Sequence, residues 1–402
     1  MPTIAVFHVR SCRLNSVLIN HFERSKHLGE SMSQPPIRVC IILGTRPEAI
    51  KLAPVIQQFR KNPLFDTQVV LTGQHKEMVA QVMQLFNLKA DHDLAIMQHG
   101  QTLTDITCRS LRGLETLFQE LKPQMVLVQG DTTTALAAAI AAFYQQIPVG
   151  HVEAGLRTDD IYNPFPEEAN RRLISQITQL HFAPTTLSVE HLERSGVVGK
   201  IYNTGNTVID ALLSVAARQL ECPIPGLDWS QHRIILSTVH RRENWGEPLK
   251  DIAHGFLRVL EKFPDAALVL PLHRNPTVRE PLTAILGDHP RVFLTEPLDY
   301  GDLVSAMQRC YLLLTDSGGL QEEAPSLGKP VLVLRETTER PEAVMAGTAK
   351  LIGTNSDDIF REAADLLGNP ESYKKMANAV NPFGDGHSSE HIVKIVEEHF
   401  GL

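Results

Sequence analysis

The sequence predicts an α/β protein made of two doubly wound domains, each built around a mainly parallel sheet. Three observations support this prediction. Short apolar runs typical of buried strands alternate with helical apolar patterns in both halves of the chain. The length of 402 residues exceeds one ordinary domain. Polar residues follow the predicted strands, where open α/β sheets bind ligands: Arg46, His75, Asp131, Glu153, His240 and Ser317.

The composition narrows the class of protein. With 43% hydrophobic and 21% charged residues, the chain has the profile of a globular protein with a full core. The net charge of −8 offers no basic excess for nonspecific nucleic-acid binding. No apolar run is long enough to span a bilayer, so no membrane partner is expected.

The cysteines and histidines indicate reduced thiols and no metal. The 5 cysteines are scattered, odd in number and without a Cys-x-x-Cys pair, which fits a cytoplasmic protein. The 17 histidines include no His-Glu-x-x-His motif and no tight cluster with cysteine. We therefore expect a cytoplasmic protein without a bound metal.

The chain divides into four expected parts. Residues 1–36 lack a sustained apolar period and the pattern of a signal peptide, and are predicted to be a disordered N-terminal extension. Residues 37–204 form the first predicted domain and 205–385 the second. A helix over 386–402 is predicted to pack back across the junction, with Ile392, Val393, Val396 and Phe400 apolar.

Strands are expected wherever a short apolar run meets a turn signal. In the first half these are 38–43, 68–72, 125–129, 148–152 and 180–183, with 180–183 completing the half and 201–205 crossing to the second. In the second half they are 234–237, 267–270, 292–294, 311–314 and 331–334, with helices between them.

The segment Asp316 to Ala324 is the centre of the predicted ligand site. Ser317, Gly318 and Gly319 follow a buried strand, and a helix starting near Ser317 would offer free N–H groups to a phosphate. Glu323, one turn later, is suited to accept hydrogen bonds from ribose hydroxyls. The structural alternative is a glycine-assisted turn with acidic residues in the first helical turn.

Three carboxylates follow strand ends in the first half: Asp131, Glu153 and Glu167. Carboxylates gathered in a cleft raise one another's pKa, which equips one of them for proton transfer. Each also has a structural alternative. Asp131 could cap the following helix, and Glu167 could pair with Arg171 one turn on.

Cationic and imidazole side chains follow other strand ends. Arg46 can grip a phosphate in bidentate fashion, or else pair with Glu48. Lys51, one turn later, adds a point charge or lies in solvent. His240 could contact the sugar or diphosphate, and Arg340 could face the same cleft; the alternative for His240 is a satisfied histidine in a basic turn.

Several long motifs together resemble one family, the non-hydrolysing UDP-N-acetylglucosamine 2-epimerases. The resemblance covers residues 37–402 in the right order and does not extend to 1–36. The motifs are Gly44-Thr45-Arg46-Pro47-Glu48-Ala49-Ile50-Lys51, Gly130-Asp131-Thr132, His151 to Thr158, Pro166 to Arg171, His240 to Asn244, Asp316 to Pro325, Gly328 to Val331 and Arg340-Pro341-Glu342.

This resemblance implies a GT-B architecture and a homodimer that converts UDP-GlcNAc to UDP-ManNAc reversibly, supplying ManNAc-type sugars for cell-surface polysaccharide. It implies no nicotinamide or other cofactor, and a route through UDP elimination, 2-acetamidoglucal and re-addition. The implied catalytic residues are Asp131, Glu153, Glu167 and His240. The implied UDP-binding residues are Arg46, Lys51, Ser317, Gly318, Gly319, Glu323 and Arg340.

Two parts of the chain depart from the family pattern. Leu298 stands where a glutamine near the uracil is expected, and Leu303 where an aromatic residue is common. Some members bind a second UDP-GlcNAc as activator through residues matching Gln74, His75 and His273. Lys76-Glu77 differs from the pattern of the strongest cases, so activation stays open.

Other readings stay open at this stage. A GT-B glycosyltransferase would share the fold but needs an acceptor groove. A 2-epimerase for a modified UDP-sugar, a hydrolysing epimerase and a non-catalytic nucleotide-sugar sensor are the remaining alternatives. Retention of all three carboxylates argues against the sensor.

Overall fold

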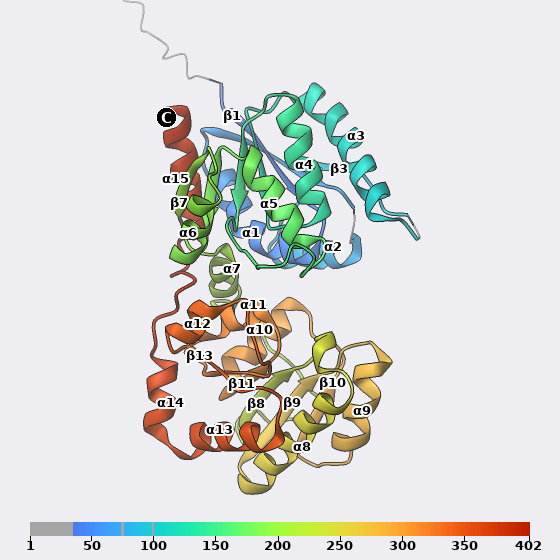
Figure 1. Ribbon diagram of the computed structural model, residues 1–402, viewed down its shortest axis with the longest axis vertical. Helices are drawn as coiled ribbons and strands as arrows, with labels where there is room; N and C mark the ends of the chain where they lie inside the picture. The colour runs from blue at the N-terminus through green and yellow to red at the C-terminus, as the bar shows by residue number, and fades with distance from the viewer. Residues whose placement is uncertain (1–34, 74–75, 99) are drawn as a thin grey trace, which may run out of the picture. The chain divides into compact units, whose positions relative to one another are not determined.

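The computed structural model describes residues 35–73, 76–98 and 100–402. Residues 36–402 form one compact unit. It contains two parallel sheets, each covered by helices on both faces (Figure 1), so the predicted GT-B architecture with two doubly wound sheets is confirmed. The predictions for residues 1–34, Gln74 and His75 fall outside the described residues.

The first sheet has seven parallel strands in the order β3-β2-β1-β4-β5-β6-β7. Its helices connect successive strands, as right-handed parallel crossovers require. The strands are β1 (Ile37–Leu43), β2 (Phe65–Leu71), β3 (His92–Asp93), β4 (Met125–Gln129), β5 (Val149–Val152), β6 (Leu180–Ala183) and β7 (Lys200–Asn203). The helices are α1 (Arg46–Lys61), α2 (Lys76–Leu85), α3 (Leu103–Leu121), α4 (Thr133–Tyr144), α5 (Glu167–Ile177), α6 (Thr186–Arg194) and α7 (Thr207–Ala216).

The second sheet has six parallel strands in the order β10-β9-β8-β11-β12-β13. The strands are β8 (Arg233–Thr238), β9 (Ala266–Pro271), β10 (Val292–Thr295), β11 (Leu312–Thr315), β12 (Val331–Val333) and β13 (Ala349–Leu351). The helices are α8 (Glu247–Lys262), α9 (Pro276–Leu286), α10 (Tyr300–Arg309), α11 (Gly318–Glu323), α12 (Pro341–Met345), α13 (Ser356–Gly368), α14 (Pro370–Ala377) and α15 (Ser388–Phe400).

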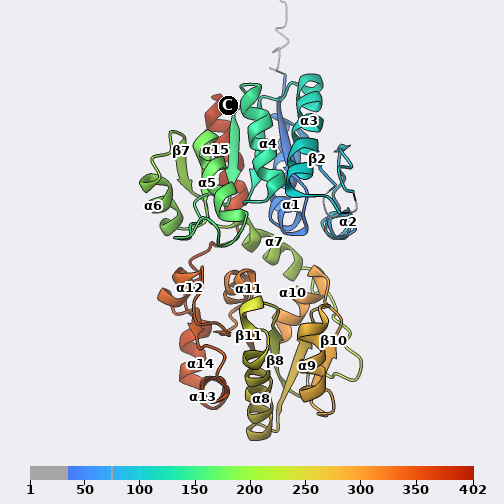
Figure 2. The same cartoon turned by 45° about the vertical axis from the view of Figure 1, so that its right-hand side comes forward.

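Alternating strand residues build the core on both faces of each sheet. On β1, Cys40 and Ile42 pack with α3, α4 and α5, which cover one face of the first sheet (Figure 2). Val39, Ile41 and Leu43 point the other way, into a cluster with α1, α7 and α15. That cluster continues into the second sheet through Ile234 and Leu236, so one apolar core joins the two sheets.

Three short strands were absent from the sequence prediction: β3, β7 and β13. Residues 180–183 therefore do not complete the first half, because β7 pairs with β6 in the stretch interpreted as a crossing. All three lie at sheet edges, where one neighbour is missing and polar residues are tolerated. Such strands have no continuous apolar run, so the apolar pattern gave no signal for them.

The last helix, α15, packs on α1 and α7, and Figure 1 shows it in red beside the first sheet. Glu397 of α15 accepts a hydrogen bond from the amide of Asn62 at the end of α1. The division into domains 37–204 and 205–385 stays a proposal. None of the described helices is long and apolar enough to cross a membrane.

Candidate functional site

The turn after β1 is fixed by a buried carboxylate. Glu48 is 1% exposed, and its Oε2 accepts hydrogen bonds from the backbone N–H groups of Gly44 and Thr45, at 2.9 and 2.6 Å. Its Oε1 accepts a hydrogen bond from the Thr132 hydroxyl at 2.6 Å. Glu48 therefore closes a capping box at the start of α1 and is not the partner of Arg46.

The guanidinium of Arg46 points to the other sheet. Its Nη2 lies 3.4 Å from the carbonyl oxygen of Leu298, in the turn after β10. Residues more than 200 positions apart thus meet at the carboxyl ends of β1 and β10, as the placement of polar residues at strand ends predicts.

Glu153 is a second buried carboxylate with several donors at the end of the first sheet. It follows β5 with a φ of 63°, a strained conformation for a residue with a side chain. Its carboxylate accepts hydrogen bonds from the Lys51 ammonium, the Gln129 amide and, at 3.3 Å, the Asn206 amide. Burial by itself raises the pKa of Glu153, but the charges of Lys51 and Arg340 and the hydrogen bonds from Lys51 and Asn206 outweigh burial and hold the pKa below its ordinary value.

A continuous polar chain connects Glu153 to the second sheet. The same Asn206 amide nitrogen donates to Glu322 Oε2 at 3.0 Å, and Glu322 Oε1 accepts from Arg340 Nε. Asn206 is 2% exposed and caps α7, which fixes its position. Two predicted UDP-binding cations, Lys51 and Arg340, are thereby held at the two ends of one network.

Asp131 follows β4 and is gripped by α5. Its Oδ2 accepts from Arg171 Nε and Nη2 at 3.0 and 2.6 Å, and its backbone carbonyl accepts from Asn170 at 2.8 Å. Burial raises the pKa of Asp131 above its ordinary value, although Arg171 opposes the rise. Thr132, not Asp131, caps α4, so the capping alternative for Asp131 is wrong.

Glu167 is the first residue of α5. Its side chain makes no hydrogen bond or ion pair with any residue that the structure describes. The alternative that Glu167 pairs with Arg171 is wrong, because the guanidinium of Arg171 contacts Asp131 and Glu168. The structure brings Asp131 and Glu153 close enough to interact electrostatically, whereas it shows no direct contact between Glu167 and either of them.

The turn after β11 is organised by Asp316, a residue whose role the sequence analysis missed. Asp316 is fully buried, and its Oδ2 accepts from the backbone N–H groups of His240 and Arg241, both at 2.8 Å. His240 Nδ1 lies 2.9 Å from Asp316 Oδ1. Burial by itself raises the pKa of Asp316, but the His240 ring and these N–H groups hold it below its ordinary value. The position of Asp316 directly before Ser317 was the available signal.

Gly318 begins α11, with Ser317 as its N-cap residue. A Cβ atom added to Gly318 would lie 3.7 Å from Arg241 Nη2 and 3.8 Å from Arg340 Cζ. Ser317, Gly318 and Arg340 are thus brought together, with a second guanidinium, that of Arg241, beside them. The arrangement places two positive charges beside the backbone at the start of α11, which suits an anion.

Glu323 ends α11 and is 5% exposed. Its Oε1 accepts a hydrogen bond from the Tyr300 hydroxyl at 2.7 Å. Burial and the neighbouring charge of Glu322 raise the pKa of Glu323 to about 7, although the Tyr300 hydrogen bond opposes the rise. Tyr300 is a site residue that the sequence analysis missed; it lies two residues after Leu298, which was the available signal.

Two of the cavities that the described residues form lie near these side chains. A cavity of about 160 Å³ is lined by Leu298 and Leu303, with His240 and His273 among its other residues. The two imidazole rings stack at a centroid distance of 6.2 Å. A larger cavity of about 1070 Å³ lies between the loop 156–164 with α5 and α6 and the turns carrying Arg241, Arg335 and Glu339. None of the predicted catalytic or UDP-binding residues lines the larger cavity.

No group of three or more histidine, cysteine or acidic side chains in the described part of the chain is arranged to hold a metal ion. His273 is described and exposed. The two other residues of the predicted activator site, Gln74 and His75, are outside the described residues, so this site is untested.

Comparison with known proteins places the chain in one family. The family model described as UDP-N-acetylglucosamine 2-epimerase matches residues 57–397. UDP-N-acetylglucosamine 2-epimerase of Escherichia coli K12 is 49% identical over 371 residues, covering 90% of this chain and 98% of that protein.

Solved structures agree with the sequence match. The UDP-GlcNAc 2-epimerase of Neisseria meningitidis bound to UDP-GlcNAc superimposes with a TM-score of 0.83 at 48% identity, covering 90% of this chain and 100% of that one. The S. aureus MnaA–UDP structure gives a TM-score of 0.83 at 44% identity, covering 91% and 97%. With the motifs at the sheet ends, these matches show that the chain belongs to the UDP-N-acetylglucosamine 2-epimerase family.

Proposed function

We propose that this protein interconverts UDP-GlcNAc and UDP-ManNAc by inverting C2 of the sugar. The observation that carries the proposal is the polar chain from Lys51 through Glu153, Asn206 and Glu322 to Arg340. It joins a proton-transfer carboxylate to cations suited to a diphosphate. Relatives at 44–49% identity that carry this name or hold UDP support the same substrate class.

The proposed reaction begins with removal of the C2 proton by a carboxylate. The C–H electron pair forms the C1–C2 double bond, and the C1–O bond breaks so that its pair leaves with UDP. The intermediate is 2-acetamidoglucal. A proton then returns to the other face of C2, UDP adds back to C1, and no group is consumed.

Asp131, Glu153 and Glu167 are the proposed proton-transfer residues. The pKa values of the two residues are shifted in opposite directions, which suits opposite roles. Asp131, with a raised pKa, keeps a proton that it can donate, whereas Glu153, with a lowered pKa, stays ionised. Glu167 has no partner among the described residues and is free to face the sugar. His240, anchored on Asp316, is proposed to contact the diphosphate or the sugar.

UDP is proposed to bind mainly at the second sheet. Ser317, Gly318, Gly319 and Arg340 would hold the diphosphate, with Arg46 and Lys51 reaching it from the first sheet. Glu323 would accept hydrogen bonds from the ribose. The cavity of about 160 Å³ with Leu298 and Leu303 would take the uracil, through backbone groups and apolar contact.

The test is a proton NMR assay of the protein with UDP-GlcNAc alone in D2O. Epimerisation with exchange of the C2 proton is expected, without acceptor, nicotinamide or metal, and EDTA should leave the rate unchanged. A glycosyltransferase would not interconvert the sugars, and a hydrolysing enzyme would release free ManNAc. Loss of activity with EDTA, or a requirement for NAD, would refute the proposal.

The finer assignments depend on separate measurements. We propose a homodimer, which light scattering would test. Activation by a second UDP-GlcNAc through Gln74, His75 and His273 would appear as sigmoidal kinetics with UDP-ManNAc, relieved by traces of UDP-GlcNAc. A modified UDP-sugar is the second candidate substrate. The departures from the family pattern at Leu298 and Leu303 concern the proposed uracil pocket and not the sugar, so they do not favour this candidate.

A further inference from the structure

A buried carboxylate that no proposed catalytic step uses lies behind Asp131. Glu168 is the second residue of α5 and is 0% exposed. Its Oε2 accepts from the backbone N–H of Thr158 at 3.0 Å and from Arg171 Nη1 at 3.2 Å. Its Oε1 accepts from Arg172 Nε at 2.5 Å. A fully buried carboxylate whose two oxygens are both occupied has no access to substrate.

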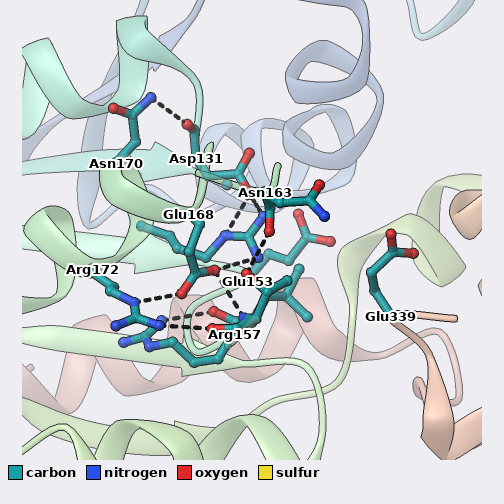
Figure 3. A network of polar contacts seen from close by, with 12 residues as sticks. Asp131, Glu153, Arg157, Asn163, Glu168, Asn170, Arg172 and Glu339 are labelled. Atoms are coloured by element: carbon teal, nitrogen blue, oxygen red, sulfur yellow. Dashed lines mark hydrogen bonds and ion pairs between the residues drawn. The ribbon is translucent and has the colours of Figure 1, made fainter. Parts of the chain in front are cut away.

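The contact with Arg171 connects Glu168 to the proposed chemistry. A guanidinium is planar with its donors in a rigid fork, so holding Nη1 fixes the directions of Nε and Nη2. Both of those atoms donate to Asp131 Oδ2, at 3.0 and 2.6 Å. Figure 3 shows the resulting chain of contacts, with Asn170 donating to the Asp131 backbone beside it.

Glu168 also contacts the loop between β5 and α5. Thr158 is tied to α5 twice, through its N–H to Glu168 and through its carbonyl oxygen, which accepts from Arg172 Nη2 at 2.7 Å. The Thr158 hydroxyl in turn donates to the carbonyl oxygen of Asn163 at 2.7 Å. This loop lines the cavity of about 1070 Å³.

We infer that Glu168 is a positioning residue, which acts through Arg171 to hold the Asp131 carboxylate in its working orientation. The inference rests on the proposed function, since it concerns the group that Asp131 presents to the sugar. A buried ion pair contributes little net stability, but removing one partner leaves the other charge uncompensated and free to reorient. In Glu168→Gln, Arg171 loses its anchor, and Asp131 loses the donors that favour its ionised form.

The test compares Glu168→Gln with Arg172→Gln in the NMR epimerisation assay across pH. For Glu168→Gln we expect kcat to fall by up to about 10²-fold, the size of effect that small misplacements cause. The basic limb of the kcat profile should move to higher pH, because Asp131, the proposed acid, then keeps its proton to higher pH. The affinity for UDP, measured by calorimetry, should stay unchanged.

Arg172→Gln is the matched control, because Arg172 contacts Glu168 and Thr158 but not Asp131. It should lower the melting temperature without moving the basic limb. If Glu168→Gln lowers only the melting temperature and leaves the limb in place, Glu168 is structural and the inference is wrong.

A second variant keeps the inference testable if Glu168→Gln does not fold. Arg171→Lys retains the charge but not the fork, and should move the basic limb in the same direction; an unmoved limb would overturn the inference. Failure of the proposed function is distinguishable, because the unmodified protein would then not epimerise UDP-GlcNAc at all.

Discussion

The carboxyl ends of the two sheets each carry a buried carboxylate, and the two carboxylates differ in protonation. Glu153, at the first sheet, has an ammonium and two amides as donors, and its pKa lies below the ordinary value. Glu323, at the second sheet, has one hydroxyl donor from Tyr300 and the charge of Glu322 nearby. Its pKa is raised to about 7.

Burial raises both pKa values and therefore does not explain why they differ, since both groups are almost fully buried. The number and charge of the donors decide. At the first sheet end the donors keep the Glu153 carboxylate ionised, whereas the second sheet end holds a carboxyl that changes charge near neutral pH. The four predictions below test this contrast, from the largest expected effect to the smallest.

The largest effect is expected from amides at the first sheet end. Asp131→Asn, Glu153→Gln and Glu167→Gln should each lower turnover by about 10²–10⁴-fold, because each removes a proposed acid or base. UDP affinity should change little, since UDP is assigned to the second sheet. Turnover and C2 exchange by NMR are the measurements.

Glu190→Gln is the control for these amides, because Glu190 lies half-buried on α6 and, among the described residues, pairs with Arg194. The variant that loses C2 exchange most completely identifies the base. Accumulation of 2-acetamidoglucal would locate the defect in re-addition. Three variants with ordinary turnover would show that the carboxylates are structural.

At the second sheet end, Glu323→Ala should weaken UDP binding by about ten- to a hundredfold, because charged hydrogen bonds are worth about 1.5–3 kcal/mol each. With a pKa of about 7, the ionised fraction of Glu323 grows as pH rises through neutrality. UDP affinity should therefore rise between pH 6 and 8, and this dependence should be weaker in Glu323→Gln.

Calorimetry at several pH values measures both effects. Glu371→Ala, an exposed position on α14, is the control for the substitution itself. Equal UDP affinity in Glu323→Ala and the unmodified protein would remove Glu323 from the UDP site.

The third prediction concerns how the free energy of unfolding depends on pH, through two histidines in the first sheet. His151 and His181 are buried partners on β5 and β6, and burial lowers their pKa to about 4 and about 3. An unfolded histidine titrates near 6.5, so the unfolded chain binds more protons below that pH. Stability should thus fall as pH falls from 6.5 toward 4.

Replacing His181 by leucine should remove the part of this loss of stability that His181 causes, about 2 kcal/mol of unfolding free energy between pH 7 and 5. Urea unfolding at the two pH values gives the difference, with the exposed His254→Leu on α8 as control. An unchanged pH dependence in His181→Leu would show that this histidine does not titrate on unfolding.

The smallest effect is expected from Tyr300→Phe, which deletes only the hydroxyl that donates to Glu323. A neutral hydrogen bond contributes about 0.5–1.5 kcal/mol, so UDP binding at pH 7 should weaken by about two- to tenfold. The loss should shrink at pH 9, where Glu323 is ionised in both proteins. A loss larger than that of Glu323→Ala would mean that Tyr300 binds UDP directly.

Much of the fold was predictable because its signals are local. The buried runs at Ile37–Leu43, Met125–Gln129 and Leu312–Thr315 are short, apolar and followed by glycine or polar turns. Parallel strands end at the same edge of a sheet, so the order of motifs predicted a common location. The edge strand Lys200–Asn203 was not predicted, because a strand at the exposed edge of a sheet has no continuous apolar run.

The sequence by itself determined which residues stand at the sheet ends, including Asp131, Glu153 and Glu323, because strand, turn and helix start are set by neighbouring residues. Only the tertiary structure decided their partners. Arg171 pairs with Asp131 across 40 positions, and Asn206 bridges Glu153 and Glu322 across the two sheets. Those contacts set the charges of the carboxylates, and they depend on packing between elements that are distant in the chain.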